Sequence, residues 1–187
     1  MKDDILKALD VLKRGGVILF PTDTHWSLGC DATNEDAVAR LLLVKKKEPG
    51  KRLLMLMENP ALLERYVSDV PEIAWDLAEI STSPLTMVFS NTRNLPGIVM
   101  AQDGTVGIRF TREDFSRELV QRFRRPVLAS SANYSGGQSP LVFMDIPDDI
   151  LKAVDYVVTF RQDDPVPAVS SSIIRLGPGG RIEIIRE

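Results

Sequence analysis

The chain has 187 residues, 44% of them hydrophobic and 26% charged, which is enough apolar sequence to bury the core of one globular domain. Its net charge of −3 excludes a general attraction to nucleic acid or anionic membranes, so any RNA contact would need a local basic patch. Cys30 is the single cysteine, which excludes an intrachain disulfide. With a charged N-terminus and no long apolar run, these features predict a soluble, cytoplasmic, single-domain protein.

Helix and strand patterns alternate along the chain. Apolar residues at helical spacing predict helices over residues 4–14, 35–47, 59–66, 72–80, 114–124 and 148–153. Thr33 with Asp36 resembles a capping box at the start of the second of these helices. Short apolar runs predict strands over residues 17–20, 53–57, 85–89, 106–110, 127–129, 154–160, 172–176 and 181–185, the last two as a hairpin. We therefore expect an α/β fold, with a twisted mixed sheet and flanking helices in one domain over residues 1–187.

Residues 126–137, PVLASSANYSGG, change from a buried strand to small polar residues. Hydroxyls, an amide and exposed backbone N–H groups at the end of a strand make a neutral cradle for an anion or a nucleotide. The same residue types also favour a simple turn. Ser130, Ser131 and Asn133 are the candidates for ligand binding here.

The sequence PTDT at residues 21–24 leaves a predicted strand directly. Its two threonines and one aspartate could bind polar groups of a substrate, and Thr24 is the candidate that we retain. A turn that begins at Pro21 is the alternative interpretation.

Five cations crowd into eight residues at Lys45, Lys46, Lys47, Lys51 and Arg52. Lysines near a helix C-terminus are favoured by the helix dipole and are usually solvated. The same cluster beside a Pro-Gly turn would suit the charge of a triphosphate. Both interpretations stay open from the sequence.

Arg109 lies in an otherwise apolar predicted strand. Arginine is rarely buried without a partner, so Arg109 either forms a structural ion pair or binds a phosphate or carboxylate at the strand end.

Several catalytic motifs are absent from the sequence. There is neither a phosphate-binding Gly-x-x-x-x-Gly-Lys loop nor a Gly-x-Gly-x-x-Gly fingerprint, and His25 is the single histidine. We therefore expect no Ser-His-Asp triad and no metal site built from protein side chains. Chemistry by positioning and charge neutralisation, as in phosphoryl or nucleotidyl transfer, fits this composition.

Taken in order, these motifs resemble the YrdC-like family of threonylcarbamoyl-AMP synthases. The matching segments cover most of the chain: PTDTHWSLG at 21–29, the lysines at 45–47 with Lys51-Arg52-Leu53, Ser83-Pro84-Leu85-Thr86, Ile108-Arg109-Phe110, SANYSG at 131–136, and Ser171-Ser172. The chain departs from the family pattern at Trp26 and Ser27 (Tyr-Gly), Lys47 (Arg), Arg52 (Pro), Ser83 (Gly) and Ser172 (Thr), and Leu56 stands where some members have a histidine. The resemblance implies a short, single-domain member whose fold surrounds a concave, partly basic cavity.

The resemblance also implies a reaction and a set of residue roles. L-threonine, bicarbonate and ATP, with Mg²⁺ expected, would give threonylcarbamoyl-AMP and pyrophosphate, and other proteins would use this product to modify tRNA. Phosphate binding and catalysis would fall to Lys45, Lys47, Lys51 and Arg109. The nucleotide would contact Ser130, Ser131, Asn133 and Lys51, and the threonine would contact Thr24, Thr86 and Ser171.

Two alternatives to the synthase stay open from the sequence. One is a non-catalytic relative that binds double-stranded RNA or tRNA, or has a regulatory role, through a patch at residues 45–52. The other is an ATP-dependent carbamoylation enzyme with another amine substrate. Residues 161–169, RQDDPVPAV, are polar and contain proline, which fits either a mobile lid or a simple connection.

Overall fold

The computed structural model describes residues 1–50, 52–165 and 168–187, and its strands form one mixed sheet in the order β7-β1-β2-β6-β3-β5-β4-β8-β9. The strands are β1 (Ile18–Phe20), β2 (Ser27–Asp31), β3 (Leu54–Met57), β4 (Leu85–Phe89), β5 (Val106–Phe110), β6 (Val127–Ser131), β7 (Tyr156–Val157), β8 (Ser172–Leu176) and β9 (Ile182–Arg186). The helices are α1 (Lys2–Lys13), α2 (Glu35–Val44), α3 (Leu63–Tyr66), α4 (Ile73–Ile80), α5 (Asp114–Phe123) and α6 (Asp148–Ala153). The predicted α/β class with a mixed sheet and flanking helices is confirmed.

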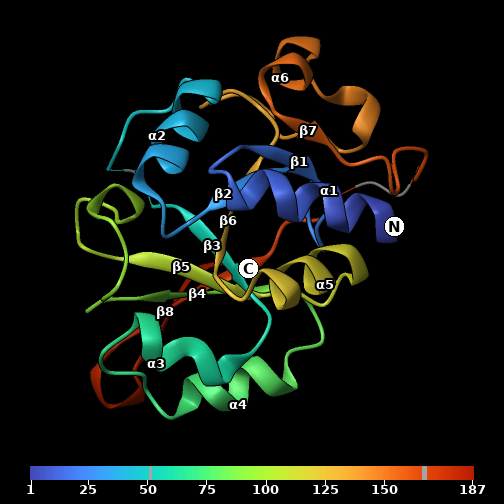
Figure 1. Cartoon of the computed structure of the whole chain (residues 1–187). Coiled ribbons are helices and arrows are strands. Elements are labelled where there is room, and N and C mark those ends of the chain that lie inside the picture. The colour runs from blue at the N-terminus through green and yellow to red at the C-terminus, as the bar shows by residue number, and fades with distance from the viewer. Residues whose placement is uncertain (51, 166–167) are drawn as a thin grey trace.

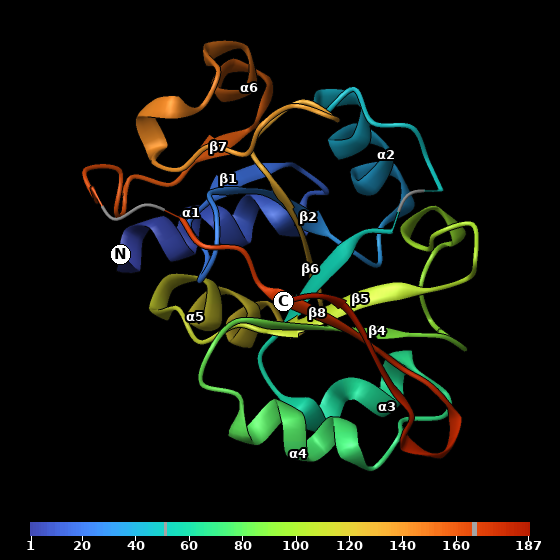
Figure 2. The ribbon, with the colours of Figure 1, turned by 180° about the vertical axis from the view of Figure 1, so that it is seen from behind.

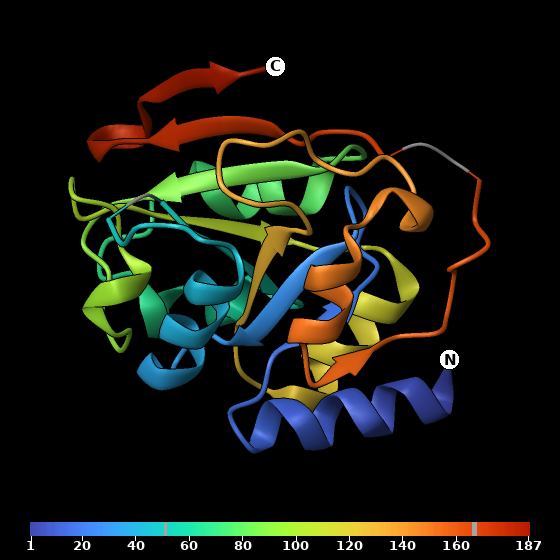
Figure 3. The ribbon, with the colours of Figure 1, turned by 90° about the horizontal axis from the view of Figure 1, so that it is seen from above.

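Helices flank the sheet at both ends of the molecule. Figures 1 and 2 show α3 and α4 at one end and α2 and α6 at the other, with the sheet between them. Seen from above, β8 and β9 form one border of the molecule and α1 the opposite border (Figure 3). The apolar core therefore lies between the helices and the sheet, as expected for a layered α/β fold.

The strand β2 was missing from the predicted elements. All five of its residues, Ser27–Asp31, are buried, and it pairs antiparallel with both β1 and β6. Its sequence, SLGCD, has neither alternation nor a β-branched residue, so its strand conformation depends on the two neighbouring strands. Because β2 pairs Ser27 with Ser131, it places the PTDT loop beside the end of β6.

The predicted helix over residues 35–47 was too long and its predicted cap was wrong. The helix α2 ends at Val44, and Lys46 adopts a left-handed conformation with φ of 50°. The N-cap is Asn34, whose side chain accepts a hydrogen bond from the Ala37 amide at 3.1 Å. Thr33 instead donates its hydroxyl to Asp31 Oδ1 at 2.6 Å. The lysines that follow α2 are therefore in a turn rather than on a helix face.

Two predicted strands also changed length. The predicted strand at 154–160 is reduced to Tyr156–Val157, which pairs with β1. The predicted strand at 127–129 extends to Ser131, because β2 provides a ladder partner for both serines. As a result, Ser130 and Ser131 are held by the sheet itself.

Candidate functional site

A cavity of about 370 Å³ opens over one face of the sheet. Its walls come from β2 to β6, from β8 and β9, and from the loops that follow β1, α2 and β6. Its polar lining residues are Thr24, His25, Ser27, Lys47, Arg52, Thr86, Arg109, Ser130, Ser131, Ser139, Ser170, Ser171 and Arg186. The fold thus brings together seven of the predicted site residues from distant parts of the chain: Thr24, Lys47, Thr86, Arg109, Ser130, Ser131 and Ser171.

Strand register explains the floor of this cavity. Gly107 of β5 pairs with Val88 of β4, and two residues further on Arg109 pairs with Thr86. Thr86 in turn pairs with Ile173 of β8. Residues two apart on a strand share one face, so these side chains all lie on the cavity side of the sheet. Gly107 has no side chain, so the space above this strand stays open to a ligand.

Arg109 is buried in the cavity wall, with only 3% of its side chain exposed. Its Nη2 lies 3.0 Å from Asp23 Oδ1 and donates to Thr24 Oγ1, also at 3.0 Å. Its Nε is buried with no hydrogen-bond partner among the described residues. Burial lowers the pKa of Arg109 and raises that of Asp23, and the contact between the two opposes both shifts. The ion pair holds the guanidinium in place and leaves it donors for an anion.

Two of the three hydroxyls assigned to threonine contact each other. Thr86 Oγ1 and Ser171 Oγ, both on buried residues, lie 2.9 Å apart. Arg186 of β9 donates to the Ser171 carbonyl oxygen from Nη2 at 2.6 Å and from Nε at 3.0 Å. Arg186 and His25 were not among the predicted site residues. Nothing in the sequence marked Arg186, because only the β8–β9 hairpin brings it to the cavity.

The other end of the cavity is formed by the loop after β6. Asn133 does not line the cavity, and its side chain stabilises this loop instead. Its Oδ1 accepts from Ser131 Oγ at 2.6 Å, and its Nδ2 donates to the carbonyl oxygens of Tyr134 and Gly137, each at 2.8 Å. Asn133 thus fixes the shape of the loop that follows Ser130 and Ser131, the last two residues of β6.

Lys45 also lies behind the cavity wall and is 3% exposed. Its Nζ donates to the carbonyl oxygen of Asn133 at 2.8 Å and to that of Ser131. Burial, and secondarily the nearby charge of Lys47, lowers the pKa of Lys45 to about 7. Lys45 therefore ties the end of α2 to the end of β6.

The cavity is strongly cationic in the part of the chain that the structure describes. Lys47, Arg52, Arg109 and Arg186 line it, and no aspartate or glutamate does. Burial, together with Arg109 and Arg186, lowers the pKa of His25. Such a lining favours a polyanionic ligand. The candidate Lys51 lies outside the described residues.

The departures at positions 26 and 27 have different consequences. Ser27 lines the cavity and donates to the His25 carbonyl oxygen at 3.0 Å. Trp26 instead packs against Phe143, with ring centroids 4.8 Å apart.

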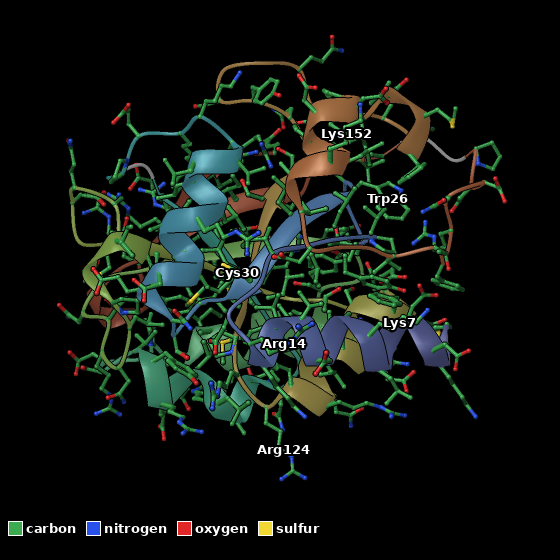
Figure 4. All side chains as sticks on the ribbon, turned by 45° about the horizontal axis from the view of Figure 1, so that its top comes forward. Lys7, Arg14, Trp26, Cys30, Arg124 and Lys152 are labelled. Atoms are coloured by element: carbon green, nitrogen blue, oxygen red, sulfur yellow. The ribbon has the colours of Figure 1, made fainter. Side chains whose placement is uncertain are left out.

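Figure 4 shows Trp26 well apart from Cys30, which lies in the interior of the molecule. Burial raises the pKa of the Cys30 thiol, so this residue is unsuited to act as a nucleophile.

Two features are absent from the residues that the structure describes. No group of three or more His, Cys, Asp or Glu residues that could hold a metal ion is present among them. None of their helices is long and apolar enough to cross a bilayer.

Comparison with known families identifies the chain. The Sua5/YciO/YrdC family model, described as "Telomere recombination", matches residues 10–187. The chain belongs to this family. Among curated Sua5/YciO/YrdC members, a threonylcarbamoyl-AMP synthase of Pseudoalteromonas translucida is 32% identical over 165 residues, covering 87% of this chain and 86% of the relative. One of Coxiella burnetii is 33% identical over 178 residues, covering 90% and 95%.

Solved structures of Sua5/YciO/YrdC proteins share the fold. Pyrococcus abyssi Sua5 complexed with L-threonine matches with a TM-score of 0.83 and 27% identity over 92% of this chain. This chain covers 50% of that Sua5 chain, so it spans about half its length. Escherichia coli YciO matches with a TM-score of 0.84 at 21% identity, covering 100% of this chain and 90% of YciO. The YciO match establishes similarity of fold alone.

Proposed function

We propose that this protein is an L-threonylcarbamoyladenylate synthase, which converts L-threonine, bicarbonate and ATP into threonylcarbamoyl-AMP and pyrophosphate. The main observation is the cavity, where cationic side chains and a neutral wall of serines meet over one face of the sheet. Family membership and the curated relatives named threonylcarbamoyl-AMP synthase support the same function.

The two walls of the cavity suit the two parts of ATP. The hydroxyls of Ser130 and Ser131, at the end of β6, would bind the AMP moiety beside a loop that Asn133 holds in shape. Lys47 and Arg109 would neutralise the phosphates, and Lys51 would add a further cation. Because no lining residue among those described is a carboxylate, Mg²⁺ would arrive on the phosphates of ATP rather than in a protein cage.

Thr24, Thr86 and Ser171 would bind L-threonine. They lie on the cavity side of the sheet, and the Thr86–Ser171 pair offers two buried hydroxyls to a small polar substrate. The L-threonine complex of the Pyrococcus abyssi Sua5 relative supports an amino-acid site in this fold.

The chemical step needs no protein nucleophile. The threonine amine adds to CO2 with release of a proton to solvent, or to bicarbonate with loss of water, and gives an N-carboxylate. One oxygen of this group attacks the α-phosphorus, the bond between that phosphorus and the bridging oxygen breaks, and pyrophosphate leaves with the electron pair. Buried cations such as Arg109 would stabilise the charge that develops on the phosphoryl oxygens. The reaction is then an adenylyl transfer, the chemistry of a nucleotidyltransferase.

The product would be consumed by proteins that transfer the threonylcarbamoyl group to tRNA. We expect these proteins to be the partners of this chain. The relatives' names favour the synthase over the RNA-binding alternative, and the net charge of −3 adds no support for strong RNA affinity.

The test is pyrophosphate release by the purified protein with ATP, Mg²⁺ and bicarbonate, offered each amino acid in turn. We expect release with threonine and none when bicarbonate is omitted, with threonylcarbamoyl-AMP detected by mass spectrometry. Serine and valine are the matched controls, because each lacks one group of the threonine side chain. Release that is independent of bicarbonate, or equal for all amino acids, would contradict the proposal.

A further inference from the structure

Arg52 stands at the rim of the cavity, held by two side chains from another part of the chain. Its Nε donates to Thr105 Oγ1 at 2.9 Å, and its Nη2 donates to Asp103 Oδ2 at 3.2 Å. The side chain is 28% exposed and still lines the cavity. Two anchoring bonds on different nitrogens fix the plane of a guanidinium, which a single contact would leave free to rotate.

Asp103 is itself held in a tight turn before β5. The turn closes with a hydrogen bond from the Ala101 amide to the Thr105 carbonyl oxygen at 2.9 Å, and Gly104 provides the required positive φ of 71°. Asp103 Oδ1 accepts from the Thr105 hydroxyl at 2.5 Å and from the Thr105 amide at 3.2 Å. The hydrogen bonds from Thr105 lower the pKa of Asp103, so it is ionised at neutral pH.

A second arginine shares this carboxylate. Arg175 of β8 donates from Nη2 to Asp103 Oδ2 at 2.6 Å. Two guanidinium groups on one carboxylate leave an excess of positive charge, and Arg52 retains N–H donors beyond the two that the anchoring bonds use. This excess charge lies at the rim of a cavity lined by further cations.

The position of this network along β5 separates it from Arg109. Thr105 precedes Arg109 by four residues, which corresponds to roughly 13 Å along an extended strand. Arg52 is therefore anchored at a point of the cavity lining that lies four residues along the chain from Arg109. Two cations anchored at different points of one cavity suit a ligand with several anionic groups better than a single phosphate or carboxylate.

We infer that Arg52, positioned by Asp103 and Thr105, binds the terminal phosphates of the nucleotide and therefore the pyrophosphate that leaves. The identity of this anion rests on the proposed function, since pyrophosphate is its product. The partial exposure of Arg52 fits a group that must release an anion to solvent. Arg109, buried in the cavity wall, would act on the reacting α-phosphate.

The experiment measures binding of inorganic pyrophosphate, ATP and AMP by calorimetry, together with steady-state kinetics. For Arg52→Ala we expect pyrophosphate and ATP affinities to fall about tenfold, the loss of one charge-assisted contact. AMP affinity should stay within about twofold, because AMP lacks the terminal phosphates. Arg52→Lys should recover part of the lost affinity, since lysine keeps the positive charge but lacks the planar set of guanidinium donors.

Asp103→Asn tests the positioning role. It keeps a similar shape but removes the charge that orients Arg52, so KM for ATP should rise about threefold or more while kcat falls less. Arg117→Ala and Asp114→Asn are the matched controls, because they break an exposed pair on α5, with contact at 3.3 Å, outside the cavity lining. Both controls should bind pyrophosphate like the wild type.

Wild-type affinities in both Arg52→Ala and Asp103→Asn would overturn the inference. A parallel loss of AMP affinity would also overturn it, because Arg52 would then support the whole site. The outcome is separable from the proposed function. Pyrophosphate binding that depends on Arg52, without threonine-dependent release, would reject the synthase and keep the polyphosphate site.

Discussion

Lys45 donates a hydrogen bond to the backbone carbonyl oxygen of Asn133 at 2.8 Å, and this contact joins the turn after α2 to the loop after β6. The backbone bond from the Ser135 amide to the Lys45 carbonyl oxygen, at 2.9 Å, closes the same connection from the other side. The turn that holds Lys45 and the loop after β6 therefore form one unit. We expect Lys45 to act on a bound ligand through the loop that it holds.

Replacing Lys45 with methionine should loosen this unit. The side-chain volume stays similar, but the Asn133 carbonyl oxygen loses its Lys45 donor, while the Ser131 carbonyl oxygen keeps the Asn133 amide, so the free energy of unfolding should fall by about 1–3 kcal/mol. Affinities for AMP and pyrophosphate should fall together, as measured by urea unfolding and calorimetry. A loss of pyrophosphate affinity alone, with unchanged stability, would instead indicate direct phosphate contact by Lys45.

Stability should depend on pH through Lys45. Its pKa is lowered from 10.5 to about 7 in the folded protein, so above about pH 7 the unfolded chain binds the extra proton. The free energy of unfolding should therefore rise as the pH increases from about 7 to 9. Subtracting the curve of Lys45→Met isolates this contribution. Parallel curves for the two proteins would show that Lys45 stays charged in the fold.

Filling the cavity floor at Gly107 should weaken ligand binding. A Cβ there would lie 3.2 Å from Thr86 Cγ2 and 3.4 Å from the Leu53 carbonyl oxygen, so a larger side chain must extend over the floor. We expect Gly107→Leu to reduce ATP affinity at least tenfold, with a stability loss of about 1–3 kcal/mol. Gly107→Ala is the graded control and should keep most of the affinity. ATP binding by Gly107→Leu at wild-type strength would place the ligand elsewhere.

Arg109→Lys should separate charge from geometry. The ammonium can keep the contact with Asp23 but cannot also offer the planar set of donors that a phosphoryl group needs. We expect kcat/KM for pyrophosphate release to fall at least tenfold, about 1.4 kcal/mol in transition-state stabilisation. The control is the thermal unfolding temperature, which should change little because the Asp23 carboxylate keeps a cationic partner. An unchanged kcat/KM would remove Arg109 from the phosphate site.

Local patterns in the sequence were enough for most elements. The strands at Leu85–Phe89 and Val106–Phe110 and the helix at Asp148–Ala153 have the predicted bounds, because apolar periodicity and turn residues mark both their ends. The sequence missed Ser27–Asp31, whose strand conformation depends on two neighbours rather than on its own residues. The predicted helix also continued past the end of α2, because lysines favour a helix. In the structure Lys45 is bonded to a distant loop instead.

By itself, the sequence determined the α/β class, the family resemblance and most of the polar residues that line the cavity, because motifs and periodicity are local properties. Only the tertiary structure decided which of these residues line the cavity and which pack behind its lining. It placed Lys45 and Asn133 behind the wall, and it brought Arg186 and the Arg52–Asp103 pair to the cavity. The physical reason is strand register, which sets side chains from β2, β4, β5, β6 and β8 on one face through pairings between residues far apart in the chain.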